Sequence, residues 1–176
     1  MRKNPHYSTS VAIDKIAAHF SASHALISDG IEEGLHGHNY HVAIELEGKT
    51  DTNEIIIDFL YLEKLLNNLL SKWDHYVLLP SNNPNIKIGR HENNLDIEYG
   101  VRFYSIPKDE VRILECSNVT TEALAKILGE KIQDKLKLEK FWPRIEKINI
   151  TIWETSCYRA TCSIQPIGQE KYENLI

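Results

Sequence analysis

The segment from residue 40 to residue 48 carries the pattern that most restricts how this chain folds. Its apolar residues Val42, Ile44 and Leu46 are two apart, and the positions between them are occupied mostly by polar residues, until Gly48 ends the pattern. Because successive side chains of a strand point to opposite faces, this alternation predicts a strand with one face buried.

Two histidines just before this segment have the same spacing. His36 and His38 share a face of an extended chain, and Gly37 leaves no side chain on the reverse face. A hairpin through residues 25–35 would bring His24 opposite the pair. Three imidazoles with one open position are typical of catalytic zinc sites, whereas structural sites are four-coordinate and rich in thiolates. A chance pair on a surface strand is the alternative, but the third histidine and the glycine favour a metal site.

Composition narrows the class of protein. A chain of 176 residues with 42% hydrophobic content predicts one globular domain, residues 1–176. The net charge of −5, with acids and bases interspersed, argues against a nucleic-acid surface. No apolar run or signal-peptide pattern predicts contact with a membrane. The cysteines, which are few and lack CxxC spacing, are expected to be reduced core thiols of a cytoplasmic protein: Cys116, Cys157 and Cys162.

Helical spacing and capping residues predict the other main elements. Apolar residues after the cap Asp58 indicate a helix over 59–70, and Thr120 or Thr121 caps a second helix that ends near Leu136. Further strands are predicted at 8–20, 145–153 and 158–164.

Residues 81–117 separate the two helices. Turn-forming residues dominate 81–100, which is expected to be the least structured part, and 101–105 with 111–114 suggest a small hairpin. The order β-β-α-(hairpin)-α-β-β predicts an α+β fold: a four-stranded antiparallel sheet with two helices on one face.

Six motifs in this order resemble the 6-pyruvoyl-tetrahydropterin synthase and 6-carboxy-tetrahydropterin synthase family. They are Phe-x-Ala-Ser-His, His-Gly-His-Asn-Tyr, Asp-Phe, Asp-His, Thr-Thr-Glu and Trp-Glu, spread over about residues 11–165. Residues 81–117 are longer than is usual in the family. The resemblance implies the tunnelling (T-) fold, a hexamer of two trimers, active sites between subunits and a small-molecule pterin substrate.

The resemblance also implies roles for particular residues. His24, His36 and His38 correspond to the ligands of Zn²⁺. Asp74 and His75 correspond to a pair in which the histidine carries a proton and the aspartate orients it. A histidine favoured by the preceding helix end is the simpler interpretation of His75.

The pterin ring would be held by residues near the second helix and the last strands. Glu154 corresponds to a carboxylate that accepts two parallel hydrogen bonds from the ring edge. Thr120 and Thr121 correspond to residues beside the ring.

One departure from the family pattern points to a particular reaction. Many of the synthases carry a catalytic cysteine about four residues before the first histidine of His-Gly-His, where this chain has Glu32 followed by Glu33. A branch with glutamate in this loop is thought to cleave the side chain of 7,8-dihydroneopterin triphosphate, giving 6-hydroxymethyl-7,8-dihydropterin, a precursor of folate or methanopterin. We therefore predict a zinc-dependent retro-aldol lyase in which Glu32, Glu33 or His75 is the base.

The alternatives are a 6-pyruvoyl or 6-carboxy synthase that works without the cysteine, and a non-catalytic protein that binds zinc and pterin. The acidic pair is also open to a simpler interpretation, as two solvated loop residues.

Overall fold

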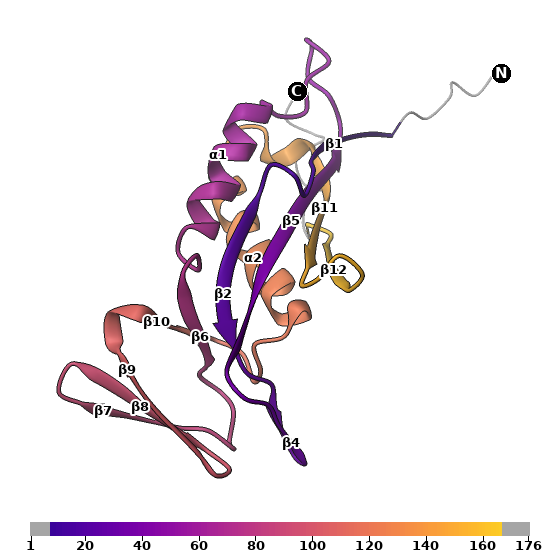
Figure 1. Cartoon of the computed structure of the whole chain (residues 1–176). Coiled ribbons are helices and arrows are strands. Elements are labelled where there is room, and N and C mark those ends of the chain that lie inside the picture. The colour runs from indigo at the N-terminus through magenta and orange to yellow at the C-terminus, as the bar shows by residue number, and fades with distance from the viewer. Residues whose placement is uncertain (1–7, 167–176) are drawn as a thin grey trace.

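The computed structural model describes residues 8–166 and contains one large mixed sheet with two helices packed on one of its faces (Figure 1). The strand order is β10-β6-β2-β5-β11-β12, and β1 also pairs with β5. The helices are α1 (Phe59–Leu70) and α2 (Thr121–Leu136). The strands of this sheet are β1 (Thr9–Ile13), β2 (His19–His24), β5 (His36–Gly48), β6 (Tyr76–Pro80), β10 (Val111–Leu114), β11 (Ile145–Trp153) and β12 (Arg159–Ile164).

The α+β class and the two helices on one face are confirmed, but the prediction of a four-stranded antiparallel sheet is wrong. The sheet has seven strands, and β6 pairs in parallel with both β2 and β10. The predicted strand over 8–20 is two strands, because the chain turns after Ile13. β1 and β2 then pair with successive halves of one edge of β5, and β11 takes the other edge.

The region expected to be least structured is a second sheet. β7 (Lys87–His91), β8 (Asn94–Tyr99) and β9 (Arg102–Pro107) form an antiparallel meander. Its turns lie where Glu92 and Gly100 adopt positive φ, so the turn-forming residues mark hairpin bends.

The hairpin predicted for 101–105 and 111–114 is also wrong. The first segment pairs with β8, whereas β10 pairs in parallel with β6 in the large sheet. Short 3₁₀ turns cover Lys108–Glu110 and Trp142–Arg144.

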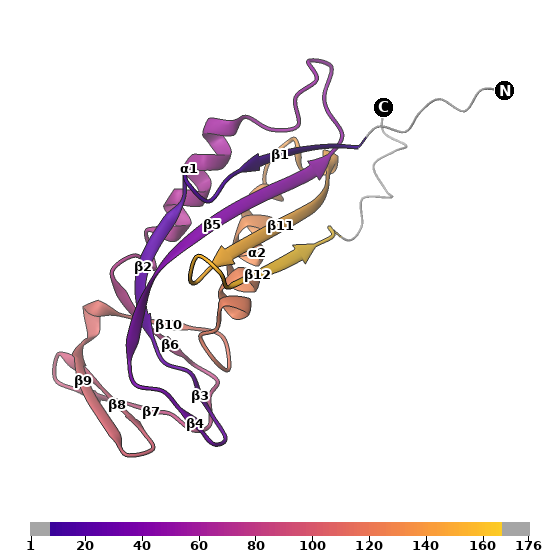
Figure 2. The ribbon, with the colours of Figure 1, turned by 45° about the vertical axis from the view of Figure 1, so that its right-hand side comes forward.

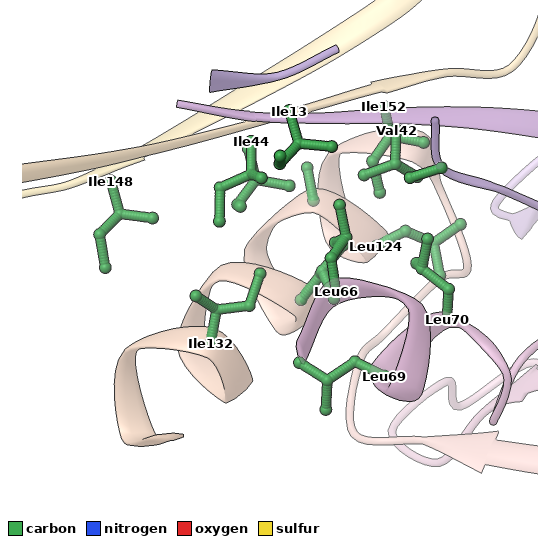
Figure 3. Close-up of a cluster of buried hydrophobic side chains, with 14 of the residues drawn as sticks. Ile13, Val42, Ile44, Leu66, Leu69, Leu70, Leu124, Ile132, Ile148 and Ile152 are labelled. Carbon is green, nitrogen blue, oxygen red and sulfur yellow. The ribbon is translucent and has the colours of Figure 1, made fainter. Parts of the chain in front are cut away.

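Both predicted helices begin at side-chain caps. The Asp58 carboxylate accepts a hydrogen bond from the Tyr61 N–H at 3.0 Å, and the Thr120 hydroxyl accepts one from the Ala123 N–H at 3.2 Å. The apolar sides of the helices meet the buried side of the sheet (Figure 3). The labelled residues of this first core are Ile13, Val42, Ile44, Leu66, Leu69, Leu70, Leu124, Ile132, Ile148 and Ile152.

A smaller, second core lies between two segments: the β7–β9 meander, called the inserted meander because it lies between the two helices, and the loop that joins β2 to β5. This loop contains the short pair β3 (Ile27–Ser28) and β4 (Ile31–Glu32), near the meander in Figure 2. The buried residues of the second core are Ala25, Ile27, Leu79, Leu95, Ile97, Tyr99 and Val111. Across residues 8–166, none of the helices has the length and apolar character needed to cross a membrane.

Candidate active site

Strand register brings the three predicted histidines together. β2 and β5 are antiparallel, and His24 at the end of β2 is paired with His36 at the start of β5. His38 lies on the same face as His36, as its spacing predicts. One nitrogen from each ring lies within 4.8 Å of the others, a spacing at which they can hold a metal ion. The expected hairpin through residues 25–35 is therefore confirmed.

Backbone carbonyls orient two of these rings. Nδ1 of His24 lies 2.7 Å from the Val119 carbonyl oxygen, and Nδ1 of His36 lies 2.9 Å from that of Gly34. A carbonyl only accepts, so each Nδ1 donates and each Nε2 keeps its lone pair for a metal. Nε2 of His24 is buried and makes no hydrogen bond, which suits a metal ligand. Burial lowers the pKa of His24, so the ring stays in its neutral, metal-binding form.

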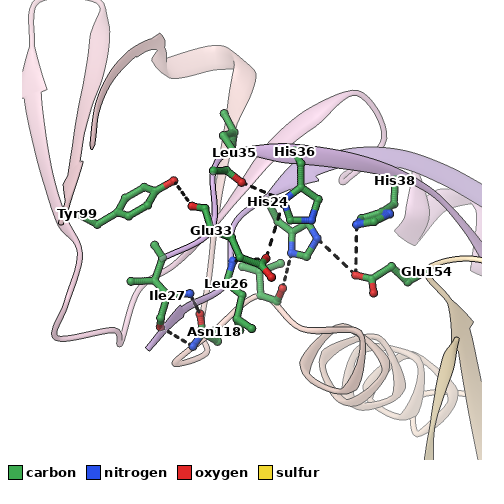
Figure 4. Close-up of polar contacts among 12 residues, drawn as sticks. His24, Leu26, Ile27, Glu33, Leu35, His36, His38, Tyr99, Asn118 and Glu154 are labelled. Atoms are coloured by element: carbon green, nitrogen blue, oxygen red, sulfur yellow. Dashed lines mark hydrogen bonds and ion pairs between the residues drawn. The ribbon is translucent and has the colours of Figure 1, made fainter. Parts of the chain in front are cut away.

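Glu154 lies beside the histidines. Its Oε1 is 3.4 Å from Nε2 of His24 and 3.6 Å from Nε2 of His38 (Figure 4). The Tyr40 hydroxyl donates to the same oxygen at 3.5 Å, and burial raises the pKa of Tyr40, which keeps it a donor. A cation held by the imidazoles would also be attracted by this carboxylate.

A cavity of about 760 Å³ opens over the histidines. The predicted site residues that line it are His24, Glu33, His36, His38, Thr120, Thr121 and Glu154. Thr120 and Thr121 line the cavity because α2 begins at its edge. The metal ligands expected from the sequence and the residues expected to hold the pterin thus share one cavity.

The structure separates the two loop glutamates. Oε2 of Glu33 is 4.0 Å from Nδ1 of His36 and accepts a hydrogen bond from the Leu26 N–H at 3.3 Å. Glu32 does not line the cavity, and its Oε2 lies 3.8 Å from Nη1 of Arg102 in the inserted meander. Of the two loop glutamates, Glu33 is therefore the one near the histidines.

Asp74 and His75 are not brought into this cavity within one chain. Nδ1 of His75 lies 2.9 Å from Oδ2 of Asp74, and Oδ1 of Asp74 accepts from the Ser21 N–H at 2.8 Å. That backbone N–H, assisted by His75, lowers the pKa of Asp74. His75 lines a different cavity of about 350 Å³, together with Ser21, Gly37 and Asn39 from the reverse face of β2 and β5. His38 lines both cavities.

Several residues that sequence analysis did not place in the site also line the larger cavity. They are Glu122, Cys157, Tyr158 and Arg159. Cys157 is exposed, so the expectation of three core thiols is wrong for this residue. The position of Cys157 three residues after Glu154 was the sequence signal that could have placed it in the cavity. No sequence signal marks the Val119 carbonyl, because its role depends on the fold.

The fold and the site define a small α+β protein with three histidines that can hold a metal ion, inside a cavity that carboxylates also line. The profile of the 6-pyruvoyl tetrahydropterin synthase family matches residues 13–165. The chain belongs to this family.

Curated relatives agree with this assignment. A protein of Methanocaldococcus jannaschii is 29% identical over 145 residues, covering 80% of this chain and 88% of its own length. One of Pyrococcus horikoshii is 32% identical over 136 residues, covering 76% of this chain and 78% of its own length. Both are provisionally named as 6-carboxy-5,6,7,8-tetrahydropterin synthases.

Solved structures show the same fold. The 6-pyruvoyltetrahydropterin synthase of Plasmodium vivax has a TM-score of 0.87 at 22% identity, covering 92% of this chain and 100% of its own. That of Plasmodium falciparum has a TM-score of 0.86 at 24% identity and covers 92% of this chain. A P. vivax variant in which a catalytic glutamate is replaced by alanine has a TM-score of 0.86 at 21% identity.

Proposed function

We propose that this protein is a zinc-dependent lyase that cleaves the side chain of 7,8-dihydroneopterin triphosphate to give 6-hydroxymethyl-7,8-dihydropterin. The observation that carries the proposal is the position of Glu33, which lines the histidine cavity beside His36. The catalytic glutamate named for the P. vivax relative supports a carboxylate in this role.

The three imidazoles suit zinc, because neutral nitrogen ligands in a set of three leave a position for substrate. Bound zinc would act as a Lewis acid that makes a side-chain hydroxyl of the substrate more acidic. In this proposal His24, His36 and His38 hold the ion, and the carbonyls of Gly34 and Val119 fix the orientation of two of the rings.

Glu33 would serve as the base of a retro-aldol step. Its carboxylate takes the proton of the C2′ hydroxyl, the C1′–C2′ bond breaks, and C2′ becomes an aldehyde carbon. The electron pair passes to C1′ and into the conjugated pterin ring, and a proton then returns to C1′. The products are 6-hydroxymethyl-7,8-dihydropterin and glycolaldehyde triphosphate, so no oxidant or reductant is needed.

Glu154 would anchor the pterin by accepting hydrogen bonds from its 2-amino group and ring N–H. Thr120 and Thr121 would flank the ring at the N-terminus of α2. His75 lines another cavity and Asp74 contacts its ring, so we propose that the pair serves a site completed by a second copy of the chain. A cytoplasmic homohexamer of two trimers, implied by the family resemblance, is part of this proposal.

A second candidate is a 6-carboxy-tetrahydropterin synthase. The names of the archaeal relatives favour it, and the thiol of Cys157 lines the same cavity. Products decide between the two when the zinc-loaded protein is incubated with 7,8-dihydroneopterin triphosphate and analysed by mass spectrometry. Hydroxymethyl-dihydropterin supports the lyase, a carboxy or pyruvoyl product supports a synthase, and unchanged substrate indicates a binding protein.

A matched pair of variants tests the base. Glu33→Gln keeps the acceptor for the Leu26 N–H but removes the basic carboxylate, so we expect the cleavage rate to fall by about 100-fold or more with zinc retained. Glu32→Gln and Cys157→Ser should keep most of the activity. Full activity of Glu33→Gln would contradict the proposed role.

A further inference from the structure

The backbone on both sides of Gly34 is held by two tyrosines of the inserted meander. The Tyr99 hydroxyl donates to the Glu33 carbonyl oxygen at 3.0 Å, and the Tyr104 hydroxyl accepts from the Leu35 N–H at 3.3 Å. Figure 4 shows the first of these contacts, with Tyr99 reaching the Glu33 backbone from the meander. The insertion therefore contacts the segment that carries both Glu33 and the carbonyl that orients His36.

The two tyrosines form a rigid pair. Their rings stack with centroids 5.9 Å apart and planes 24° apart, and Tyr99 is buried in the second core. Pairing of Ile97 with Tyr104 fixes their relative position on adjacent strands. Burial raises the pKa of Tyr99, so its hydroxyl keeps the proton that it donates.

Few contacts other than those of the tyrosines hold the segment. The Glu33 N–H donates to the Leu26 carbonyl oxygen at 3.1 Å, and the Gly34 carbonyl oxygen accepts from His36 at 2.9 Å. Glu33 is about half exposed, and the Leu26 N–H is a weak anchor for its carboxylate at 3.3 Å. Gly34 has no Cβ and so has wide conformational freedom. A displacement of about 1 Å in a catalytic group can cost about 100-fold in rate.

We propose that Tyr99 and Tyr104 are positioning residues, through which the inserted meander holds residues 33–35 and so aims the Glu33 carboxylate at the histidine cavity. This inference depends on the proposed function only for the role of Glu33 as the base. The hold on the loop itself is independent of the reaction. The insertion is thus a support for the active-site loop.

Conservative variants test the hold without emptying the core. Tyr99→Phe and Tyr104→Phe remove only the hydroxyls, so the stacked rings remain in place. The exchange of the Leu35 amide hydrogen is measured in the full chain without zinc or substrate. We expect it to be about fivefold faster or more in Tyr104→Phe than in the wild type, because one hydrogen bond is lost. Unchanged exchange at Leu35 would overturn the proposal.

Kinetics provide a second measurement. In the zinc-loaded double variant Tyr99→Phe/Tyr104→Phe, we expect kcat to fall by about tenfold to 100-fold and KM for 7,8-dihydroneopterin triphosphate to change little, because Glu154 and the threonines are untouched. A rise in KM with unchanged kcat would overturn the positioning role.

The control is Ser105→Ala in the same meander. Ser105 donates to Asp96 at 2.7 Å and makes no contact with residues 25–35 among its described hydrogen bonds, so neither the exchange nor kcat should change. If wild-type protein leaves the substrate intact, the proposed function fails. The exchange measurement, made without substrate, then still decides whether the tyrosines hold the loop.

Discussion

The two hydrophobic cores position different parts of the candidate site by different means. In the first core, strand register places the histidines and Glu154, because β2, β5 and β11 are adjacent strands whose inward side chains are buried. In the second core, the loop with Glu33 is held by side-chain hydrogen bonds from the insertion. The proposed metal ligands and the proposed base thus belong to separately supported regions.

This difference shows how a loop can be fixed next to a rigid site. The side chains of Asn83 and Asn118 both donate to the Ile27 carbonyl, and Asn118 also accepts from the Ile27 N–H. These residues lie before and after the meander, so the insertion is tied to the loop at its base as well as through the tyrosines. The loop and the inserted meander are thus joined by side-chain hydrogen bonds, whereas the strands of the large sheet are joined by backbone hydrogen bonds.

The largest effect should come from the proposed metal centre of the first region. His36→Ala removes a proposed ligand. Loss of a residue that only hydrogen-bonds a ligand lowers metal affinity by up to about 100-fold, so we expect zinc affinity to fall by more than that. His41→Ala is the matched control on the reverse face of β5. Equal zinc content in the two purified variants, measured by atomic emission, would contradict the assignment of the ligands.

A matched pair of core variants compares the two regions directly. Ile150 and Ile97 are both fully buried, one in each core. Ile150→Ala should lower the free energy of unfolding of the whole chain by about 2–5 kcal/mol in urea denaturation. Ile97→Ala should instead show faster amide exchange first in residues 25–35, with zinc still bound.

The comparison would fail if Ile97→Ala lost its zinc, or if its amide exchange increased in both regions to the same extent. In that case the two cores would unfold as one unit, and the loop would have no separate support.

A smaller effect is expected at the base of the loop. Asn118→Ala leaves the Ile27 N–H without its acceptor at 3.0 Å, which should cost about 1–3 kcal/mol in the free energy of unfolding. Asn94→Ala, which loses a single contact to Ser105 on an exposed strand, serves as the control in the same denaturation series. A similar loss of unfolding free energy in both variants would show that the hydrogen bonds of Asn118 to Ile27 do not stabilise the loop.

The smallest effect concerns acid stability of the first region. The pKa of Asp74 lies below its usual 3.8, chiefly because of the Ser21 N–H. The stability that it contributes is therefore present above that value and is lost as the pH falls through the lowered pKa. Asp74→Asn should weaken the dependence of the urea midpoint on pH below about 4. If the urea midpoint of Asp74→Asn depended on pH below about 4 as strongly as that of the wild type, Asp74 would make no such contribution to acid stability.

The residues whose roles were predictable are those whose signal is local. The alternation along β5, the caps Asp58 and Thr120, and the spacing of the three histidines each depend on backbone geometry within a few residues. The resemblance to the pterin synthases, carried by motifs in order, then indicated the family that the comparisons confirm.

The sequence by itself determined both helices, the strands β5, β11 and β12, and the convergence of His24, His36 and His38, because period and hairpin geometry are short-range properties. Only the tertiary structure decided the parallel pairing of β6, the fold of residues 81–117, the position of Glu33 rather than Glu32 in the histidine cavity, and the position of His75 outside it. Those outcomes depend on which surfaces distant segments bury against each other, and burial is non-directional, so no local pattern encodes the partner.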